Sequence, residues 1–162
     1  MFGFGEIVKV PRVPYWHFGV SLGSKGVIDH AKIQGVARRT WEEFAKGRRV
    51  VSAEISGPFV GEEVVARAYS QIGKPYDLLE DNCEHFARWC VGTEAKSVQI
   101  QKYTLVAPLM AAACYSKSPS VAVASIAGAI GATLAPEGKS PAAYAAVFGL
   151  LGFIGASLTL SK

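Results

Sequence analysis

The stretch Asp81-Asn82-Cys83-Glu84-His85-Phe86-Ala87-Arg88-Trp89-Cys90-Val91-Gly92 predicts a short helix with a cysteine in its first turn. Asp81 or Asn82 can cap the start of this helix, and Gly92 can end it. Apolar residues recur at helical spacing, which predicts one buried face made of Cys83, Phe86, Ala87, Cys90 and Val91. This pattern turns Cys83 inward, towards whatever sheet the helix packs on.

Cys83 is the first candidate for chemistry. The helix dipole and the unpaired amides of a first turn favour a thiolate, so we expect the pKa of this thiol to be lowered. The same amides could hold an oxyanion. A thiolate nucleophile needs a base within hydrogen-bond reach, and the base needs an orienting partner. A lone cysteine on an apolar helix face is often inert core as well, so spacing alone leaves both readings open.

Two histidines upstream could supply the base and its partner. Residues 17–22 and 26–30 flank a glycine-rich turn and predict a β-hairpin, with His17 opening one arm and His30 ending the other. A two-residue or a four-residue loop would put both imidazoles on one face of the sheet, and an odd loop would put them on opposite faces. If the loop is even, His17 and His30 are therefore candidates for the base and its orienting partner beside Cys83.

The third histidine, His85, lies two residues after Cys83 and so faces about 200° away from it on a helix. We expect a surface or capping residue. Apart from Cys83-x-His85, no Cys or His residues have the close spacing of metal-ligand motifs, so we expect no metal site. We expect no cofactor either.

The rest of the first hundred residues predicts strands followed by helices. Residues 6–10 and 49–55 are further candidate strands, and Thr40-x-x-Glu43 is a capping-box pattern that opens a short helix stopped at Gly47. Residues 61–72 have helical periodicity. Without a regular βαβ alternation, this order favours a compact α+β domain with an antiparallel sheet packed on helices.

Charge divides the 162-residue chain into two unlike parts. Residues 1–102 carry 14 of the 17 basic and 12 of the 13 acidic side chains. The remaining charges are Lys117, Glu137, Lys139 and Lys162. We therefore expect a domain at 1–102 and a hydrophobic helical tail at 103–162.

The tail contains two long uncharged stretches, Ser118–Pro136 and Ser140–Ser161. Each is long enough for a transmembrane helix, and the spacing of Gly149, Gly152 and Gly155 favours close helix packing. A third uncharged stretch, Tyr103–Ser116, is short and contains a proline. The tail is thus expected to be a membrane anchor or a helical hairpin, the alternative being core helices of a larger soluble fold.

Composition excludes several classes of protein. Half of the residues are apolar, which excludes intrinsic disorder, and a net charge of +4 is too mild to indicate a nucleic-acid binder. Three cysteines form no disulfide framework and indicate free thiols in a reducing compartment, so we expect the domain on the cytoplasmic side of a membrane. No signal-peptide pattern is visible at the N-terminus. The oligomeric state is not indicated.

These motifs resemble the lecithin:retinol acyltransferase (LRAT) family, which includes the H-Ras-like suppressor phospholipase/acyltransferases. Residues 82–86 match its Asn-Cys-Glu-His-Phe signature, and residues 15–20 followed by 27–30 resemble its histidine box. Residues 76–79 and 97–99 also fit, so the resemblance spans roughly residues 5–102. An ordered set of motifs of this kind is a specific signal.

The resemblance implies a circularly permuted papain-like fold of the NlpC/P60 superfamily. It implies Cys83 as nucleophile, His17 as general base and His30 as the third, polar member, with Tyr15 near the substrate or the oxyanion. It further implies an acyl-thioester formed from a glycerophospholipid, whose acyl group passes to water, an alcohol or an amine. The expected partners are therefore a phospholipid substrate and a membrane.

Two other functions stay open. A cysteine peptidase or amidase, as among NlpC/P60 relatives, would use the same Cys/His chemistry on a peptide. A non-catalytic, membrane-active protein would work through its long tail of small residues.

Overall fold

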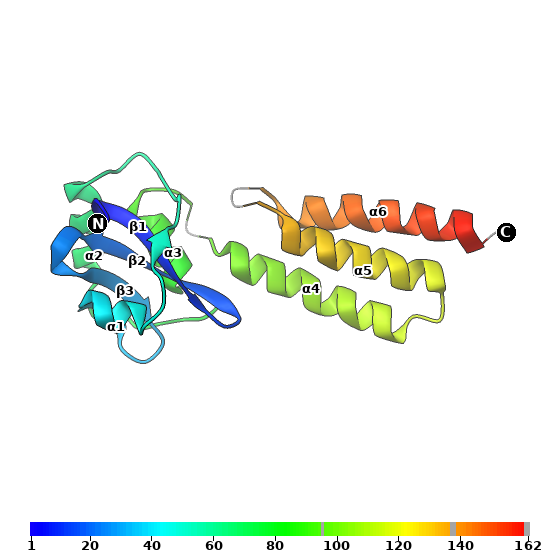
Figure 1. Ribbon diagram of the computed structural model, residues 1–162, viewed down its shortest axis with the longest axis horizontal. Helices are drawn as coiled ribbons and strands as arrows, with labels where there is room; N and C mark the ends of the chain where they lie inside the picture. The colour runs from blue at the N-terminus through cyan, green and yellow to red at the C-terminus, as the bar shows by residue number, and fades with distance from the viewer. Residues whose placement is uncertain (95, 137–138, 161–162) are drawn as a thin grey trace. The chain divides into compact units, whose positions relative to one another are not determined.

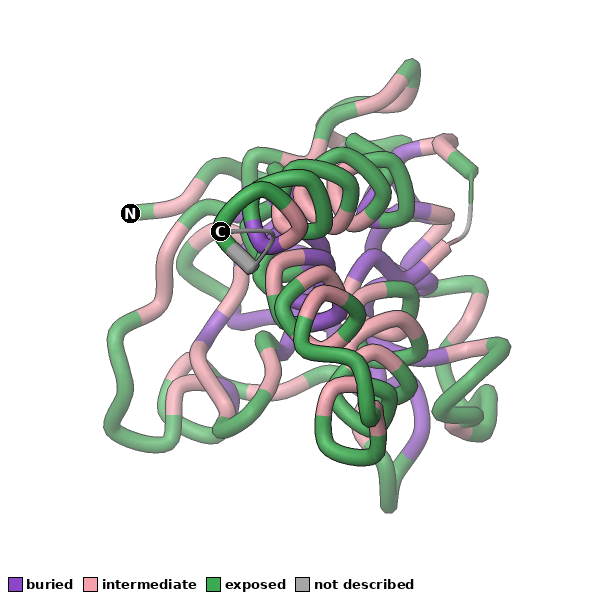
Figure 2. The backbone as a smooth tube through the Cα atoms, turned by 90° about the vertical axis from the view of Figure 1, so that its right-hand side faces the viewer, coloured by how far each residue is buried: buried purple, intermediate pink, exposed green. Residues whose placement is uncertain are grey.

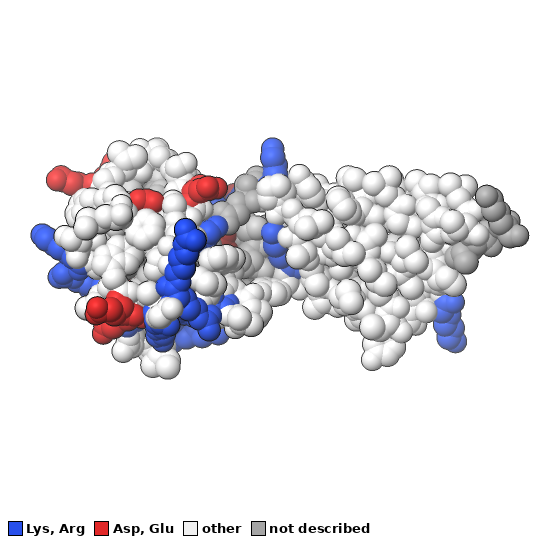
Figure 3. Space-filling view, in the orientation of Figure 1, with Lys and Arg blue, Asp and Glu red and all other residues white. Residues whose placement is uncertain are grey.

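The structure is a computed structural model that describes residues 1–94, 96–136 and 139–160. The chain forms two compact units, Met1–Ser97 and Val98–Lys162 (Figure 1). The division falls a few residues before the boundary expected at residue 102, because the first helix of the second unit already begins at Val98. Figure 3 shows the same division in charge: acidic and basic side chains cover the first unit, and the second is almost bare of them.

The first unit is built on an antiparallel sheet, which confirms the predicted α+β class. Its strands lie in the order β4-β3-β2-β1-β5. Their bounds are β1 (Phe4–Arg12), β2 (Tyr15–Leu22), β3 (Val27–Ala31), β4 (Gly35–Arg39) and β5 (Val51–Ser52). The predicted hairpin is β2–β3. Strand β4 was not predicted, since its two arginines and two small residues do not alternate as a half-buried strand should.

Three helices complete this unit: α1 (Trp41–Ala45), α2 (Glu62–Ser70) and α3 (Cys83–Cys90). The predicted capping box of α1 is present, with Thr40 and Glu43 each bonding to the other's backbone N–H. All three helices lie where the sequence predicted them, α1 from its capping box and α2 and α3 from apolar periodicity. Local signals sufficed here because caps act on the adjacent turn.

The two faces of the sheet are covered by different helices. Helices α2 and α3 pack on the face that carries Phe18, Val20 and Ile28, and this side holds the larger buried cluster. Helix α1 packs through Phe44 on the opposite face, against Val8, Val10 and Val27. In Figure 2 the buried stretches of backbone (purple) run between intermediate and exposed ones. The face of an apolar side chain on β2 or β3 therefore decides which of the two buried clusters it joins.

The second unit consists of α4 (Val98–Tyr115), α5 (Pro119–Leu134) and α6 (Pro141–Leu160). Helix α4 continues through Pro108. Helices α5 and α6 pack at small residues: a Cβ on Gly131 would lie 2.5 Å from Tyr144 O, and one on Gly152 would lie 2.7 Å from Ala127 Cβ. Gly149 also lies at this contact, whereas nothing is within 4 Å of a Cβ on Gly155, so the predicted packing role of Gly155 was wrong.

One helix of the second unit is long and apolar enough to cross a membrane, Pro141–Thr159 within α6. Helix α5 has only 16 residues, because Ser118 caps its start and the helix stops at Leu134. At 1.5 Å per residue, it falls short of a hydrocarbon core about 30 Å thick. We expected each of the two uncharged stretches to be long enough to cross a membrane. By helix length, only the second one, in α6, is. Ser161, the expected end of that stretch, and Glu137 and Lys162 lie outside the described residues.

Candidate active site

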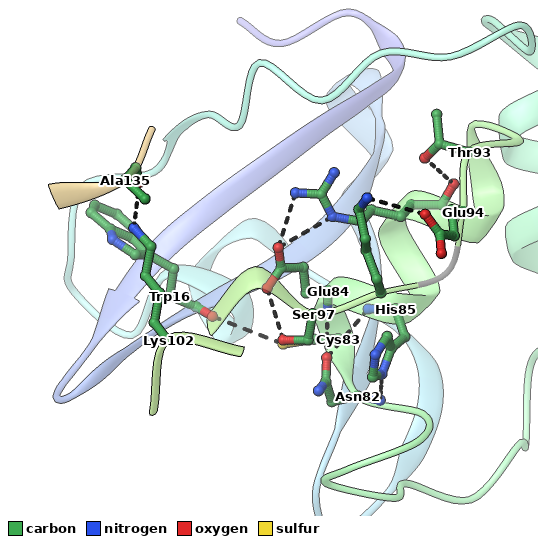
Figure 4. A network of polar contacts seen from close by, with 12 residues as sticks. Trp16, Asn82, Cys83, Glu84, His85, Thr93, Glu94, Ser97, Lys102 and Ala135 are labelled. Carbon is green, nitrogen blue, oxygen red and sulfur yellow. Dashed lines mark hydrogen bonds and ion pairs between the residues drawn. The ribbon is translucent and has the colours of Figure 1, made fainter. Parts of the chain in front are cut away.

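Asn82 sets the position of Cys83 by capping helix α3. Its side-chain oxygen accepts hydrogen bonds from the backbone N–H groups of Glu84 (2.9 Å) and His85 (3.2 Å). Its side-chain amide donates to Leu78 O at 2.9 Å, and its own N–H donates to His85 Nδ1 at 3.3 Å. Asn82 is thus the cap, and His85 takes the capping role that was one of its two expected roles; it is not a surface residue, because its side chain is buried (Figure 4).

A buried polar network stabilises the same helix. Glu84 accepts hydrogen bonds from the Arg88 guanidinium at 3.0 and 3.2 Å and from Ser97 Oγ at 2.9 Å (Figure 4). All three residues are buried. These partners offset the free-energy cost of burying the Glu84 carboxylate. Removing one of them would leave a buried charge without a partner. The network therefore fixes the first turn of α3, where Cys83 lies.

Cys83 is buried between α3 and strand β2. Its Sγ donates to Trp16 O at 3.9 Å, the carbonyl of the peptide that precedes His17. Burial raises the pKa of the Cys83 thiol to about 12, and the Glu84 and Asp29 carboxylates add to this, although hydrogen bonds from the backbone of Phe18 and Cys83 oppose it. The predicted lowering of this pKa was wrong, because desolvation outweighs the helix N-terminus.

His17 lies on β2 beside that contact and bonds to Asp29. His17 Nε2 and Asp29 Oδ2 are 2.8 Å apart, and both side chains are buried. A carboxylate only accepts hydrogen bonds, so Nε2 carries the proton and Nδ1 is the basic nitrogen. Asp29 is held in turn by Arg39, whose Nε donates to Asp29 Oδ1 at 2.6 Å. The imidazole is thereby oriented by a carboxylate that is itself anchored.

The length of the β2–β3 loop decides which residue meets His17. Three residues, Gly23–Lys25, form a single 3₁₀ turn, and the strands pair Ser21 with Val27 and Gly19 with Asp29. Gly26 closes the turn with a φ of +111°, where a Cβ would lie 2.1 Å from Arg39 O. The loop is odd, so both even-loop alternatives for sharing a face were wrong: His17 and His30 lie on opposite faces of the sheet.

His30 is fully buried on the face covered by α3. Its ring packs edge-on against Tyr76 (5.1 Å between centroids) and Phe86 (6.0 Å). Its Nε2 donates to Pro75 O at 3.0 Å, while Asp81 Oδ1 lies 3.7 Å from Nδ1. Burial lowers the pKa of His30, and Asp81 opposes that change. His30 therefore does not contact the Nε2 of His17. The family resemblance had implied His30 as the third catalytic residue beside Cys83 and His17.

A cavity of about 450 Å³ opens at this site and gathers side chains from several elements. His17, Asp29 and His30 line it together with Tyr15, which is the position expected near a substrate. Tyr76 also lines it, and burial raises the pKa of its hydroxyl. The volume lies in the range of small-ligand pockets. The rim is basic, with Arg12, Lys32, Arg39 and Lys46 against Asp29 and Glu43.

Sequence reasoning missed Asp29 and Arg39. Asp29 directly precedes His30, and only the loop parity tells which of the two faces His17. Arg39 lies on β4, the strand that was not predicted. Cys90 is buried core, as expected, and Cys114 is exposed on α4. Among the described residues, no group of three or more His, Cys, Asp or Glu side chains is arranged to hold a metal ion.

A family model and several known proteins that resemble this chain all carry the same name. Residues 2–96 match the family model "Lecithin retinol acyltransferase". The mouse protein lecithin retinol acyltransferase is 27% identical over 136 aligned positions, which cover 61% of this chain and 58% of the relative. The bovine protein of the same name is 28% identical over 134 positions (61% and 58%), and the human one 27% over 123 (53% of each). The chain thus spans somewhat more than half the length of these relatives.

Proposed function

Because the chain belongs to the lecithin retinol acyltransferase family, we propose that it is a thiol-dependent acyltransferase or phospholipase A-type hydrolase acting on glycerophospholipids. In this proposal Cys83 is the nucleophile, His17 the general base, and Asp29 the residue that orients His17. Tyr15 contacts the substrate. The proposal replaces His30 by Asp29 as the third member of the set.

One observation carries the proposal: the Cys83 sulfur contacts the peptide next to His17, and His17 is hydrogen-bonded to the anchored carboxylate of Asp29. Covalent catalysis requires a nucleophile, a base and a third group that orients the base, and the last two are in contact here. The pocket lined by His17 and Asp29 provides space for the reacting ester. These contacts support the set Cys83, His17 and Asp29.

The first half-reaction forms the acyl-enzyme. His17 Nδ1 takes the Cys83 proton as Sγ attacks the ester carbonyl of the lipid, which gives a tetrahedral oxyanion. When this collapses, the C–O bond breaks and the lysophospholipid alkoxide leaves with the proton from His17. The acyl chain remains on Cys83 as a thioester.

The second half-reaction returns the thiol. Water, an alcohol or an amine gives its proton to His17 and attacks the thioester carbonyl, and the C–S bond breaks as Sγ recovers the proton. Since burial raises the pKa of Cys83 to about 12, the resting thiol is neutral, and general-base assistance is required at every turnover. Asp29 stabilises the imidazolium formed in both halves.

The second unit suits an enzyme whose substrate resides in a bilayer. Helix α6 is apolar along its length, and the charge of the chain is concentrated in the first unit. We therefore assign residues 98–162 to membrane anchoring, by α6 alone or with α5 as a hairpin. The free thiols of the chain favour the cytoplasmic side.

The test is acyl transfer to Cys83 from phospholipid with labelled acyl chains. Full-length protein in detergent–lipid micelles should acquire a hydroxylamine-labile label that mass spectrometry places on Cys83. Cys83→Ser and His17→Ala should abolish the label. Cys90→Ser is the matched control, because Cys90 is a buried thiol on the same helix and should be dispensable.

Two outcomes would contradict the proposal. If the protein cleaves peptides and takes no label from any lipid, it is a peptidase or amidase. If neither substrate reacts while vesicles become leaky in the protein's presence, the chain acts through its second unit without catalysis.

A further inference from the structure

Two strongly exposed apolar side chains lie at the rim of the pocket. Ile33, in the turn between β3 and β4, is 97% exposed and lines the pocket. Val13, at the tip of the β1–β2 hairpin, is 88% exposed, and the pocket residues Arg12 and Tyr15 flank that tip. Isolated exposed apolar residues need no explanation, but a group of them at one functional opening indicates an apolar partner.

The two tips are neighbours in space. Lys32, which precedes Ile33, holds its Nζ 5.4 Å from the centre of the Tyr15 ring. Trp16 follows on the same strand, is 39% exposed and has Lys9 Nζ 5.3 Å from its ring centre. Aromatic rings bordered by lysines are typical of protein surfaces that lie at the boundary between lipid and water.

The charge of the rim points to an anionic partner. The two acidic side chains of the pocket are engaged, Asp29 with His17 and Arg39, and Glu43 with the N–H of Thr40. Lys32 and Lys46 are exposed, and neither forms an ion pair with any part of the chain that the structure describes. Figure 3 shows basic side chains gathered on the visible face of the first unit. Such lysines are attracted to anionic lipid headgroups.

We propose that Val13, Tyr15, Lys32, Ile33 and Lys46, together the pocket rim, dock on the surface of an anionic bilayer. Ile33 and Val13 enter the acyl-chain boundary, and Lys32 and Lys46 bind lipid phosphates. Docking turns the mouth of the pocket towards lipid, so that an acyl chain reaches the pocket residues His17 and Asp29 without crossing water. The inference rests on the proposed function for the location of the substrate, and adds how the first unit meets it.

The test measures depth at defined residues of the full chain. Cys114→Ser removes the exposed thiol, and Cys83→Ser stops the reaction, so that the lipid stays unchanged during the measurement. An environment-sensitive fluorophore is attached through Ile33→Cys or, as the matched control, Val60→Cys, because Val60 is 74% exposed and lies outside this pocket. The protein is reconstituted in phosphatidylcholine vesicles that contain an acyl-chain-brominated quencher lipid. About 30% phosphatidylserine gives the vesicle surface the negative potential that attracts lysines.

The label at residue 33 should be quenched several-fold more strongly than the label at residue 60. Lys32→Glu with Lys46→Glu should remove most of that difference, as should vesicles of phosphatidylcholine alone. Equal quenching at residues 33 and 60 would overturn the proposal, and so would a difference that survives charge reversal. Because this readout needs no turnover, a failure here is distinct from a failure to acylate Cys83.

Discussion

The two histidines of hairpin β2–β3 lie in opposite surroundings although adjacent strands carry them. His17 faces α1 and bonds to Asp29, and both histidines line the same cavity. His30 faces α3, is fully buried against Phe86 and Tyr76, and bonds to a backbone carbonyl. One residue of loop length separates these two outcomes. The comparison teaches that a pair of candidate residues on a hairpin cannot be assigned before the parity of its loop is known.

The largest expected effect is on the rate of acyl transfer, and it comes from substituting Asp29, which bonds to His17. Asp29→Asn should lower kcat for lipid acyl transfer by about 1,000-fold or more, since an amide in place of the orienting carboxylate favours the wrong imidazole tautomer. Single-turnover acylation of Cys83 measures this loss, and the melting temperature checks that the variant is folded. His30→Gln is the matched variant, with an expected loss of less than about tenfold. If His30→Gln costs as much as Asp29→Asn, the proposed choice of Asp29 over His30 as the orienting residue is wrong.

On the face of the sheet that α3 covers, substituting His30 is expected to lower the stability of the fold. His30→Ala should lower the free energy of unfolding by about 2–4 kcal/mol, because it leaves a cavity beside Phe86 and Tyr76 and removes the bond to Pro75 O. Denaturant unfolding of the full chain in micelles measures this. His30→Gln, which keeps a donor and most of the volume, should cost less. A loss below about 0.5 kcal/mol, typical of surface substitutions, would contradict the buried position.

The smallest effect is a pH dependence of stability. Burial lowers the pKa of His30 below its ordinary value of 6.5, so the unfolded chain takes up the proton first as the pH falls. Stability present above pH 6.5 is therefore lost progressively below it, by about 1.4 kcal/mol per pH unit at most for one such group. Burial lowers the pKa of His85 too, and that residue contributes in the same direction.

Thermal unfolding between pH 7.5 and 5.5 tests this dependence. The midpoint should fall with pH in the wild type and fall less in His30→Gln, which lacks one of the two histidines whose pKa burial lowers. Identical slopes for the two proteins would place the proton uptake elsewhere, with His85 as the next residue to vary.

Several features of the first unit could be predicted from the sequence because they are local. The cap of α3 at Asn82, the capping box of α1 and the buried stripe of α3 each depend on residues within two turns. The family motifs predicted Cys83 and His17 as a pair, and this pairing stays a prediction; the Cys83 sulfur lies 3.9 Å from the carbonyl of Trp16, the residue before His17. The division into a charged part and an uncharged part followed from counting charges.

The sequence by itself therefore determined the fold class, the nucleophile candidate and the apolar character of the last third. Tertiary structure alone decided that Asp29 and not His30 meets His17, because a loop's length, set by Gly23 to Gly26, fixes the parity of the opposite strand. It also decided that the pKa of Cys83 is raised, because burial depends on the distant strand that covers the thiol. Both depend on contacts between residues far apart along the chain, which no local pattern records.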